Sequence, residues 1–170
     1  MDIKKLIRDV PDFPKKGIIF KDITPLLKDK KAFSLSIDLL AKKYKNKRID
    51  KIISMESRGF IFGSALAYKL KCGFVPVRKK GKLPWKTRSV SYDLEYGTDT
   101  LEIHQDAFSK GENILIVDDV LATGGTAKAV TSLVKKTGAK LVGLCFLIEL
   151  SFLKPRTKIK DIEIFSLITY

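Results

Sequence analysis

Apolar and polar positions follow two alternating periods along most of the chain. Over residues 31–44 apolar side chains recur at Leu35, Leu39 and Leu40, which is close to the helical period and predicts a helix. Further on, short β-rich runs alternate with helical stretches. We expect strands at 51–55, 74–77, 114–117 and 141–148, and helices at 60–70 and 127–136. Such alternation predicts crossover connections, and therefore an α/β fold with a mainly parallel twisted sheet and helices on both faces.

Two stretches depart from this alternation. At the start, a short amphipathic helix is expected over residues 3–10, after which Pro11 and Pro14 favour an extended segment. Residues 78–97 are polar and contain Gly81, Pro84 and Gly97, with a β-like patch at 89–94. We interpret them as a mobile hairpin or lid.

Length and composition predict one soluble domain over residues 1–170. No apolar run approaches the roughly 20 residues that a bilayer requires, and the first residues lack a signal-peptide pattern, so no membrane partner and a cytoplasmic location are expected. The two cysteines, Cys72 and Cys145, lie in apolar stretches, which favours buried reduced thiols. Because His104 is the single histidine, zinc chemistry is not expected.

The net charge of +14 has two interpretations. It could indicate a polyanion-binding protein, or it could be a compositional bias. Only six of the 33 basic residues are arginines, the residue type that recognises phosphates and bases bidentately. Compositional bias therefore explains most of the excess, and no nucleic-acid partner is expected.

The strongest local signal begins with the apolar run 114–117, which delivers Asp118 and Asp119 to the carboxyl end of a strand. A small-residue turn and a helix follow. Glycines allow positive φ and close backbone approach, and the free N–H groups of a first helical turn favour an anion. The predicted phosphate loop consists of Ala122, Thr123, Gly124, Gly125 and Thr126.

Two acids beside a phosphate loop would repel the phosphate unless they have another partner. A ribose phosphate supplies one, because carboxylates accept hydrogen bonds from vicinal hydroxyls while a divalent cation shares the charge. The alternative is that Thr126 only caps the helix and the acids are solvated turn residues. The combination of strand, acid pair and phosphate loop makes this alternative the weaker one.

This run resembles the phosphoribosyl pyrophosphate signature of the type I phosphoribosyltransferases, and no Walker-type Gly-Lys-Thr is present. Other segments resemble the adenine-specific branch of that family, in order along nearly the whole chain. They are Pro11-Asp12-Phe13-Pro14, Phe20-Lys21-Asp22-Ile23-Thr24-Pro25, Glu56-Ser57-Arg58-Gly59-Phe60, the basic run 78–84 and Ser91-Tyr92-Asp93-Leu94-Glu95-Tyr96-Gly97.

The resemblance implies a type I phosphoribosyltransferase fold with a small N-terminal base-binding hood over residues 1–30 and a flexible lid loop over 78–97. It implies that the backbone of Ile19, Phe20 and Lys21 reads the edge of adenine while Phe20 stacks on it. An extended backbone offers a donor and an acceptor per residue, which suits the amino group and ring nitrogen of adenine. An apolar strand that simply packs into the core is the alternative.

The remaining implied roles concern the sugar, the pyrophosphate and the proton. Asp118 and Asp119 would bind the ribose. Glu95 would be the catalytic acid or base, its carboxyl pKa raised in a closed pocket, and Tyr96 would help seat the lid. The cations implied at the pyrophosphate are Arg58, Arg78, Lys79 and Lys82. The alternative interpretation for each of these side chains is that it is an ordinary solvent-exposed surface residue.

The implied reaction transfers the phosphoribosyl group from phosphoribosyl pyrophosphate to adenine and gives AMP and pyrophosphate, in purine salvage. Mg²⁺ would be held mainly by the substrate, with no direct protein ligand assigned, and the chain would form a homodimer. Two alternatives remain. One is a sister transferase for hypoxanthine, guanine or xanthine, and the other is a non-catalytic regulator that binds phosphoribosyl pyrophosphate and nucleic acid.

Overall fold

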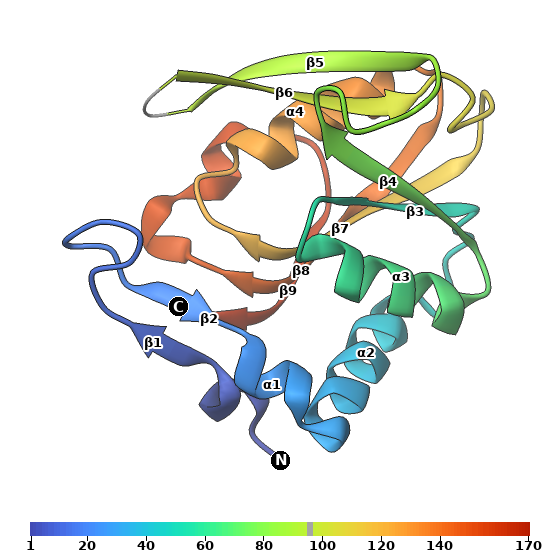
Figure 1. Cartoon of the computed structure of the whole chain (residues 1–170). Helices are drawn as coiled ribbons and strands as arrows, with labels where there is room; N and C mark the ends of the chain where they lie inside the picture. The colour runs from blue at the N-terminus through green and yellow to red at the C-terminus, as the bar shows by residue number, and fades with distance from the viewer. Residues whose placement is uncertain (95–96) are drawn as a thin grey trace.

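The computed structural model describes residues 1–94 and 97–170 (Figure 1). The 3₁₀ helices are η1 (Ile3–Leu6), η2 (Ser151–Leu153) and η3 (Pro155–Lys158), and the α-helices are α1 (Thr24–Lys28), α2 (Lys30–Tyr44), α3 (Gly59–Leu70) and α4 (Gly125–Lys135). The strands are β1 (Arg8–Val10), β2 (Phe20–Asp22), β3 (Lys51–Met55), β4 (Gly73–Lys79), β5 (Thr87–Leu94), β6 (Gly97–His104), β7 (Asn113–Leu121), β8 (Lys140–Glu149) and β9 (Ile164–Thr169).

Seven strands form the main sheet in the order β5-β6-β4-β3-β7-β8-β9. The five strands from β4 to β9 in this order run parallel, whereas β5 and β6 are antiparallel to their neighbours. β3 pairs with both β4 and β7, so their carboxyl ends meet at one edge of the sheet. The expected α/β fold with a mainly parallel sheet is confirmed.

Alternate residues of the central strands pack into two separate cores. Ile52 and Leu115 belong to the core that α2 and α3 cover, whereas Ile53 and Ile116 belong to the core that α4 covers. Burial on both faces explains why these strands are continuously apolar rather than alternating. Figure 1 shows α1–α3 on one side of the sheet and α4 on the other.

The helix expected over residues 3–10 is wrong beyond its first turn. A 3₁₀ helix ends at Leu6, and Arg8–Val10 forms β1, which pairs antiparallel with Phe20–Asp22. An apolar spacing suited to a short helix was overridden because β2, from another part of the chain, supplies ladder hydrogen bonds.

The other departures are longer or additional elements. Of the hairpin expected within residues 78–97, the first strand, β5, lies in that range, whereas its partner β6 begins only at Gly97 and runs to His104. The mobility of the segment stays a prediction. β7 runs on through both aspartates to Leu121, and β9 and α1 were not anticipated. None of the helices in the described part of the chain is long and apolar enough to cross a membrane.

Candidate active site

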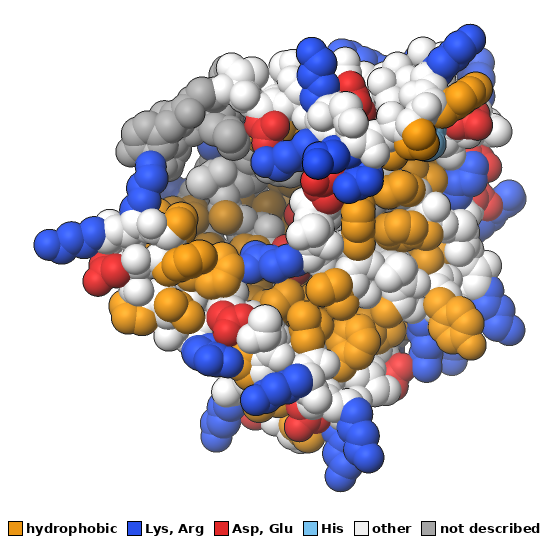
Figure 2. All heavy atoms as spheres, viewed as in Figure 1, with side chains coloured by type: hydrophobic (Ala, Val, Ile, Leu, Met, Phe, Trp, Pro, Cys, Tyr) orange, Lys and Arg blue, Asp and Glu red, His pale blue; other side chains and the backbone are white. Residues whose placement is uncertain are grey.

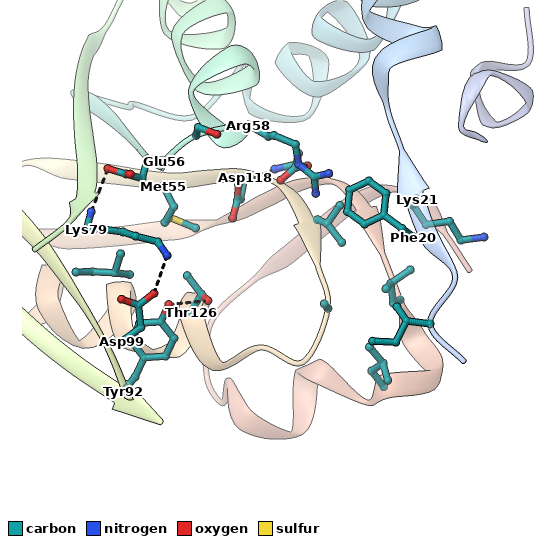
Figure 3. A pocket seen from close by; sticks show the side chains of 18 of the residues that line it. Phe20, Lys21, Met55, Glu56, Arg58, Lys79, Tyr92, Asp99, Asp118 and Thr126 are labelled. Atoms are coloured by element: carbon teal, nitrogen blue, oxygen red, sulfur yellow. Dashed lines mark hydrogen bonds and ion pairs between the residues drawn. The ribbon is translucent and has the colours of Figure 1, made fainter. Parts of the chain in front are cut away.

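A cavity of about 610 Å³ opens where β3 and β7 end, between β2 and the β5–β6 ribbon. Figure 2 shows the hollowed surface on this face, and Figure 3 shows the side chains around it. The cavity brings together most of the residues predicted from the sequence: Ile19, Phe20, Lys21, Arg58, Lys79, Asp118, Asp119, Ala122 and Thr126. Segments from four separate parts of the chain therefore meet at one edge of the sheet, as ligand sites in open α/β sheets do.

The predicted phosphate loop forms a smaller adjoining hollow of about 90 Å³, which Thr123, Gly124 and Gly125 line together with Asp118. Gly124 has φ of 81°, and a Cβ atom there would lie 2.7 Å from the carbonyl oxygen of Pro155. Both the backbone conformation and the available space require glycine. Gly125 is instead the first residue of α4 and is not among the glycines with positive φ, so it does not use the freedom that glycine allows.

Thr126 does not act as the cap of α4. The N-cap residue is Gly124, with no side-chain cap, and the Thr126 hydroxyl instead donates a hydrogen bond to the Tyr92 hydroxyl oxygen at 3.4 Å. The first-turn N–H groups of α4 are thus left without a side-chain acceptor at the N-cap, which suits an anion. The alternative interpretation of Thr126 as a capping residue is wrong.

Asp118 and Asp119 lie within β7 rather than in a solvated turn. Asp119 is 5% exposed, and burial raises the pKa of its carboxyl. Burial, followed by the neighbouring Asp119 charge, raises the pKa of Asp118 well above its usual range. The Asp118 carboxylate accepts a hydrogen bond from the Asp119 N–H at 2.9 Å. Burial makes the charged forms of both carboxylates unfavourable. Such an arrangement indicates a site where a bound ligand supplies the missing hydrogen-bond donors.

Arg58 lies between the acid pair and the hood strand. Its Nε is 2.6 Å from Asp119 Oδ2, and its guanidinium is 4.8 Å from the centre of the Phe20 ring. Asp119 Oδ2 is buried and accepts no hydrogen bond from the described residues, although the Arg58 charge lies beside it. A hydroxyl group of a ligand would supply the hydrogen bond that this oxygen lacks.

The hood segment presents apolar side chains and a short strand to the cavity. Ile18 and Ile19 are 45% and 56% exposed, and the Phe20 ring packs edge-on against Phe13 at 5.1 Å. The ammonium group of Lys21 lies 2.6 Å from Asp9 and 3.8 Å from the centre of the Tyr170 ring. It is therefore the backbone and the Phe20 ring, rather than the Lys21 charge, that suit a flat heterocycle.

The predicted pyrophosphate cations are not all in the cavity. Lys79 lines it, and its ammonium lies 3.3 Å from Asp99. Arg78 is not among the lining residues, because its guanidinium donates to Glu56 at 2.9 Å and to the Lys82 carbonyl at 3.1 Å. Lys82 contributes this carbonyl and likewise does not line the cavity. Arg58 and Lys79 remain as cations facing the site.

Comparison with known proteins identifies the family to which this chain belongs. A family model described as "Phosphoribosyl transferase domain" matches residues 23–168. The chain belongs to the phosphoribosyltransferase family. Adenine phosphoribosyltransferases of Pseudothermotoga lettingae and Geobacter metallireducens are each 59% identical to it, over 100% and 99% of both chains respectively. The sequence resemblance to adenine-specific members is confirmed.

Solved structures of phosphoribosyltransferases share the fold closely. Adenine phosphoribosyltransferase of Thermoanaerobacter pseudethanolicus superposes with a TM-score of 0.97 at 56% identity, covering 99% of this chain and 98% of that one. The Saccharomyces cerevisiae enzyme superposes with a TM-score of 0.92 at 42% identity, covering 98% of this chain and 96% of that one. That structure is a complex with D-2,5-dideoxy-2,5-imino-altritol 1,6-bisphosphate and adenine.

Several lining residues were given no role in the site from the sequence. Glu56 and Ser57 follow β3, Tyr92 and Asp99 belong to the ribbon, and Leu153 follows β8. Glu56 accepts hydrogen bonds from Arg78 Nε and from the Lys79 N–H, at 2.9 and 3.1 Å, and so ties the ends of β3 and β4 together. The position of Glu56 and Ser57 after a buried strand was a usable signal; the position of Leu153 carried none.

Two predictions lie outside what the structure describes. Glu95, the predicted catalytic acid or base, and Tyr96, the predicted lid residue, fall between residues 94 and 97. The ribbon that leads to them passes over the phosphate loop, as the contact between Tyr92 and Thr126 shows. Both roles stay predictions.

The donor set fits Mg²⁺ brought by a substrate rather than a resident metal. In the described ranges, no three His, Cys, Asp or Glu side chains come together as a metal site. Two adjacent carboxylates are nevertheless present, and one of their oxygens accepts no hydrogen bond from the described residues. Mg²⁺ commonly binds one or two carboxylates and completes its octahedron with substrate oxygens and water.

Proposed function

We propose that this enzyme transfers the 5-phosphoribosyl group of phosphoribosyl pyrophosphate to adenine, releasing pyrophosphate and giving AMP. One observation carries the proposal: the acid pair and the Phe20 segment line one cavity of a phosphoribosyltransferase fold, and the phosphate loop lines the hollow that adjoins it. The high identity with adenine phosphoribosyltransferases supports adenine over other bases.

In this proposal the sugar binds along β7 and the loop that follows it. The 5-phosphate lies on the N–H groups at the start of α4, with Thr123 and Thr126 as hydroxyl donors. The 2- and 3-hydroxyls donate to Asp118 and Asp119. Their raised pKa values support this role, because hydroxyl donors stabilise the charged carboxylates that burial disfavours.

The base binds on the opposite side of the cavity. Phe20 stacks on the purine ring, and the backbone of Ile19 and Lys21 offers the donor and acceptor that the amino group and adjacent ring nitrogen of adenine require. Hypoxanthine presents the opposite polarity on that edge and would leave buried groups unpaired. The exposed Ile18 and Ile19 side chains are available to cover the ring.

The reaction is a substitution at the anomeric carbon. The bond from this carbon to the pyrophosphate oxygen breaks, the sugar passes through an oxocarbenium-like state, and the bond to the adenine nitrogen forms on the opposite face. Arg58 and Lys79 stabilise the departing pyrophosphate, and Glu95 accepts the proton that the imidazole nitrogen loses. The ribbon excludes water, which would otherwise capture the cation.

Mg²⁺ is the proposed cofactor. When bound, it neutralises charge on the pyrophosphate and so makes it a better leaving group. Asp118 and Asp119 would share it with the oxygens of the substrate. The protein side chains then position the sugar and bind the phosphate, and require no covalent intermediate with the enzyme.

A coupled assay with Mg²⁺ and phosphoribosyl pyrophosphate tests the proposal directly. Initial rates are compared for adenine, hypoxanthine, guanine and xanthine, with and without a chelator. Adenine should be preferred by a factor of about 10⁴ or more if unpaired polar groups reject the other bases. A preference for another base would assign the sister reaction. A salt-dependent shift of duplex DNA without any transfer would favour the regulator.

We also propose that the enzyme is a cytoplasmic homodimer. The free thiols of Cys72 and Cys145 support a reducing compartment. Helix α3 supports self-association, because Ile61 and Tyr68 on it are 37% and 87% exposed. Light scattering should give twice the chain mass of 19.1 kDa, and a monomer mass would contradict the dimer.

A further inference from the structure

An ion pair between a buried carboxylate and a half-exposed guanidinium joins the end of β8 to the short helix η3. Glu149, the last residue of β8, is 3% exposed. Its two carboxylate oxygens accept hydrogen bonds from Nε and Nη2 of Arg156, both at 2.7 Å, and Ser166 of β9 donates a third bond at 2.7 Å. The Arg156 bonds are the main reason that the pKa of Glu149 lies below its usual range. Two parallel bonds to one carboxylate fix orientation as well as distance.

The residues between these two partners, 150–155, form one wall of the candidate site. Leu150 and Leu153 line the main cavity. The Leu150 N–H donates to the carbonyl of Leu121 at 2.9 Å, directly before the phosphate loop. At the other end of the wall, the Pro155 carbonyl lies against Gly124. The segment thus contacts both the start and the centre of the loop.

The wall is short, and its two halves are held differently. It consists of the single turn η2 and the start of η3, and short 3₁₀ turns have poor hydrogen-bond geometry. Ser151 anchors the first half, because its N–H donates to the Tyr170 carbonyl at 2.9 Å. Phe152 and Leu153 are 65% and 41% exposed, and Lys154 has φ of 49°. The second half, which carries the Pro155 carbonyl, is linked back to the end of β8 by the pairing of Arg156 with Glu149.

We propose that Glu149 and Arg156 are positioning residues for the sugar phosphate. Their pairing holds residues 150–155 so that the Pro155 carbonyl braces Gly124 and keeps the phosphate loop open for its ligand. Neither side chain lines the main cavity or the loop hollow, so both act through the wall. This inference rests on the proposed function, because its readout is the binding of phosphoribosyl pyrophosphate.

The test compares two variants of Arg156. Arg156→Met keeps a long side chain but removes the guanidinium group. Arg156→Lys keeps the positive charge but loses one of the two parallel hydrogen bonds to Glu149. Initial rates are measured over a range of phosphoribosyl pyrophosphate at saturating adenine. Arg156→Met should raise KM for this substrate about tenfold, within the range of indirect coupling through packed residues, and leave kcat within about threefold. Arg156→Lys should give an intermediate KM.

Arg48→Met is the matched control. Arg48 pairs with Asp50 at 3.1 Å, at the start of β3 and away from the strand ends that form the site, and its side chain is 82% exposed. Its KM should equal that of the unaltered enzyme. Melting temperatures of all variants are recorded, because a purely structural role for Arg156 would lower the melting temperature and leave KM unchanged.

The outcomes separate this inference from the proposed function. An active unaltered enzyme together with an unchanged KM in folded Arg156→Met overturns the positioning role and leaves the transfer reaction standing. No transfer by the unaltered enzyme with any base refutes the proposed function and this inference with it. If Arg156→Met does not fold, Arg156→Lys and Glu149→Gln decide, and an unchanged KM in both rejects the inference.

Discussion

Gly59 leaves room for the carboxylate of Asp118: a Cβ atom at position 59 would lie 2.4 Å from Asp118 Oδ1. Gly59 is the first residue of α3, after β3, and Asp118 lies near the end of the neighbouring strand β7. The close approach of a helix start to a strand end thus sets where one member of the acid pair sits. The need for glycine at position 59 is therefore explained by the Asp118 side chain, which lies about sixty positions later in the sequence.

Gly59→Ala should therefore impair ribose binding more than folding. The added methyl group forces Asp118 to rotate away, which should raise the dissociation constant for ribose 5-phosphate about tenfold, the loss of roughly one hydrogen bond to a charged group. Alanine is also a better helix former than glycine, which offsets part of the strain. Calorimetric titration measures the affinity. Gly73→Ala is the control, because the nearest atom to its methyl group belongs to the flexible Lys51 side chain, at 3.1 Å, and the nearest backbone atom lies at 3.6 Å.

Gly124→Ala should destabilise the protein and weaken phosphate binding together. The positive φ alone costs about 1 kcal/mol for a residue with a Cβ, and the clash with the Pro155 carbonyl adds to it, for a total of about 2–4 kcal/mol. Gly111→Ala is the matched control, because Gly111 has φ of 84° and no atom within 4 Å of an added Cβ. Urea unfolding of both variants isolates the clash. Equal losses in the two would contradict the contact with Pro155.

Asp118→Asn should stabilise the protein while it impairs binding. Folding raises the carboxyl pKa above its unfolded value of about 3.9, so between these two pKa values the folded state binds more protons than the unfolded chain. The contribution of Asp118 to the free energy of unfolding therefore increases as the pH is lowered. The increase begins near the pKa of the folded state and is complete below the unfolded value of about 3.9. At pH 8 the charged form is a cost, and Asp118→Asn should raise the free energy of unfolding by about 1 kcal/mol and flatten its pH dependence.

Denaturant unfolding between pH 4.5 and 8 checks this prediction. Asp106→Asn, at an exposed acid, serves as the comparison and should leave the stability curve unchanged. A less stable Asp118→Asn protein at pH 8 would show that the carboxylate is compensated in the unliganded protein.

Phe20→Leu should raise KM for adenine with little effect on KM for phosphoribosyl pyrophosphate. Base–aromatic stacking contributes about 1–3 kcal/mol, which corresponds to a roughly 5- to 150-fold loss of affinity. Steady-state kinetics with each substrate varied in turn separate the two constants. Phe165→Leu is the comparison, because Phe165 lies on β9, is partly buried and is not among the residues that line the cavity. Equal effects on both KM values would argue against stacking.

Glu95→Leu should depress kcat far more than the affinity for phosphoribosyl pyrophosphate. General acid–base catalysis contributes about 10²–10⁴-fold, and leucine keeps the size of the side chain without a titratable group. Turnover is measured at saturating substrates and affinity by titration without base. An unchanged kcat would remove Glu95 from the proposed mechanism.

The fold was largely predictable because its strongest elements are set by local patterns. The runs at 51–55 and 114–117 are apolar on both faces, and each was followed by a helix of the expected period. Residues 3–10 failed because their pattern suited a short helix, while the deciding hydrogen bonds came from residues 20–22. The strand at 164–169 completes the sheet beside β8, and its pairing partner lies some twenty residues earlier.

The candidate site was predictable where its residues are adjacent in the chain. Asp118, Asp119 and the loop 122–126 share one continuous motif, and all of them line the two hollows. The basic run 78–82 was less informative. The sequence spacing does not predict that Lys79 faces the cavity while Arg78 bonds to Glu56. The directions of these two side chains depend on where β3 ends beside β4.

By itself the sequence determined the alternation of the central strands and helices, the acid pair and the predicted phosphate loop, since each depends on residues that are neighbours along the chain. Only the tertiary structure decided that Arg58 lies between Phe20 and Asp119, that Tyr92 meets Thr126, and that Pro155 braces Gly124. These contacts join segments tens of residues apart. Their geometry follows from the strand order and from packing on both faces of the sheet, which no local pattern encodes.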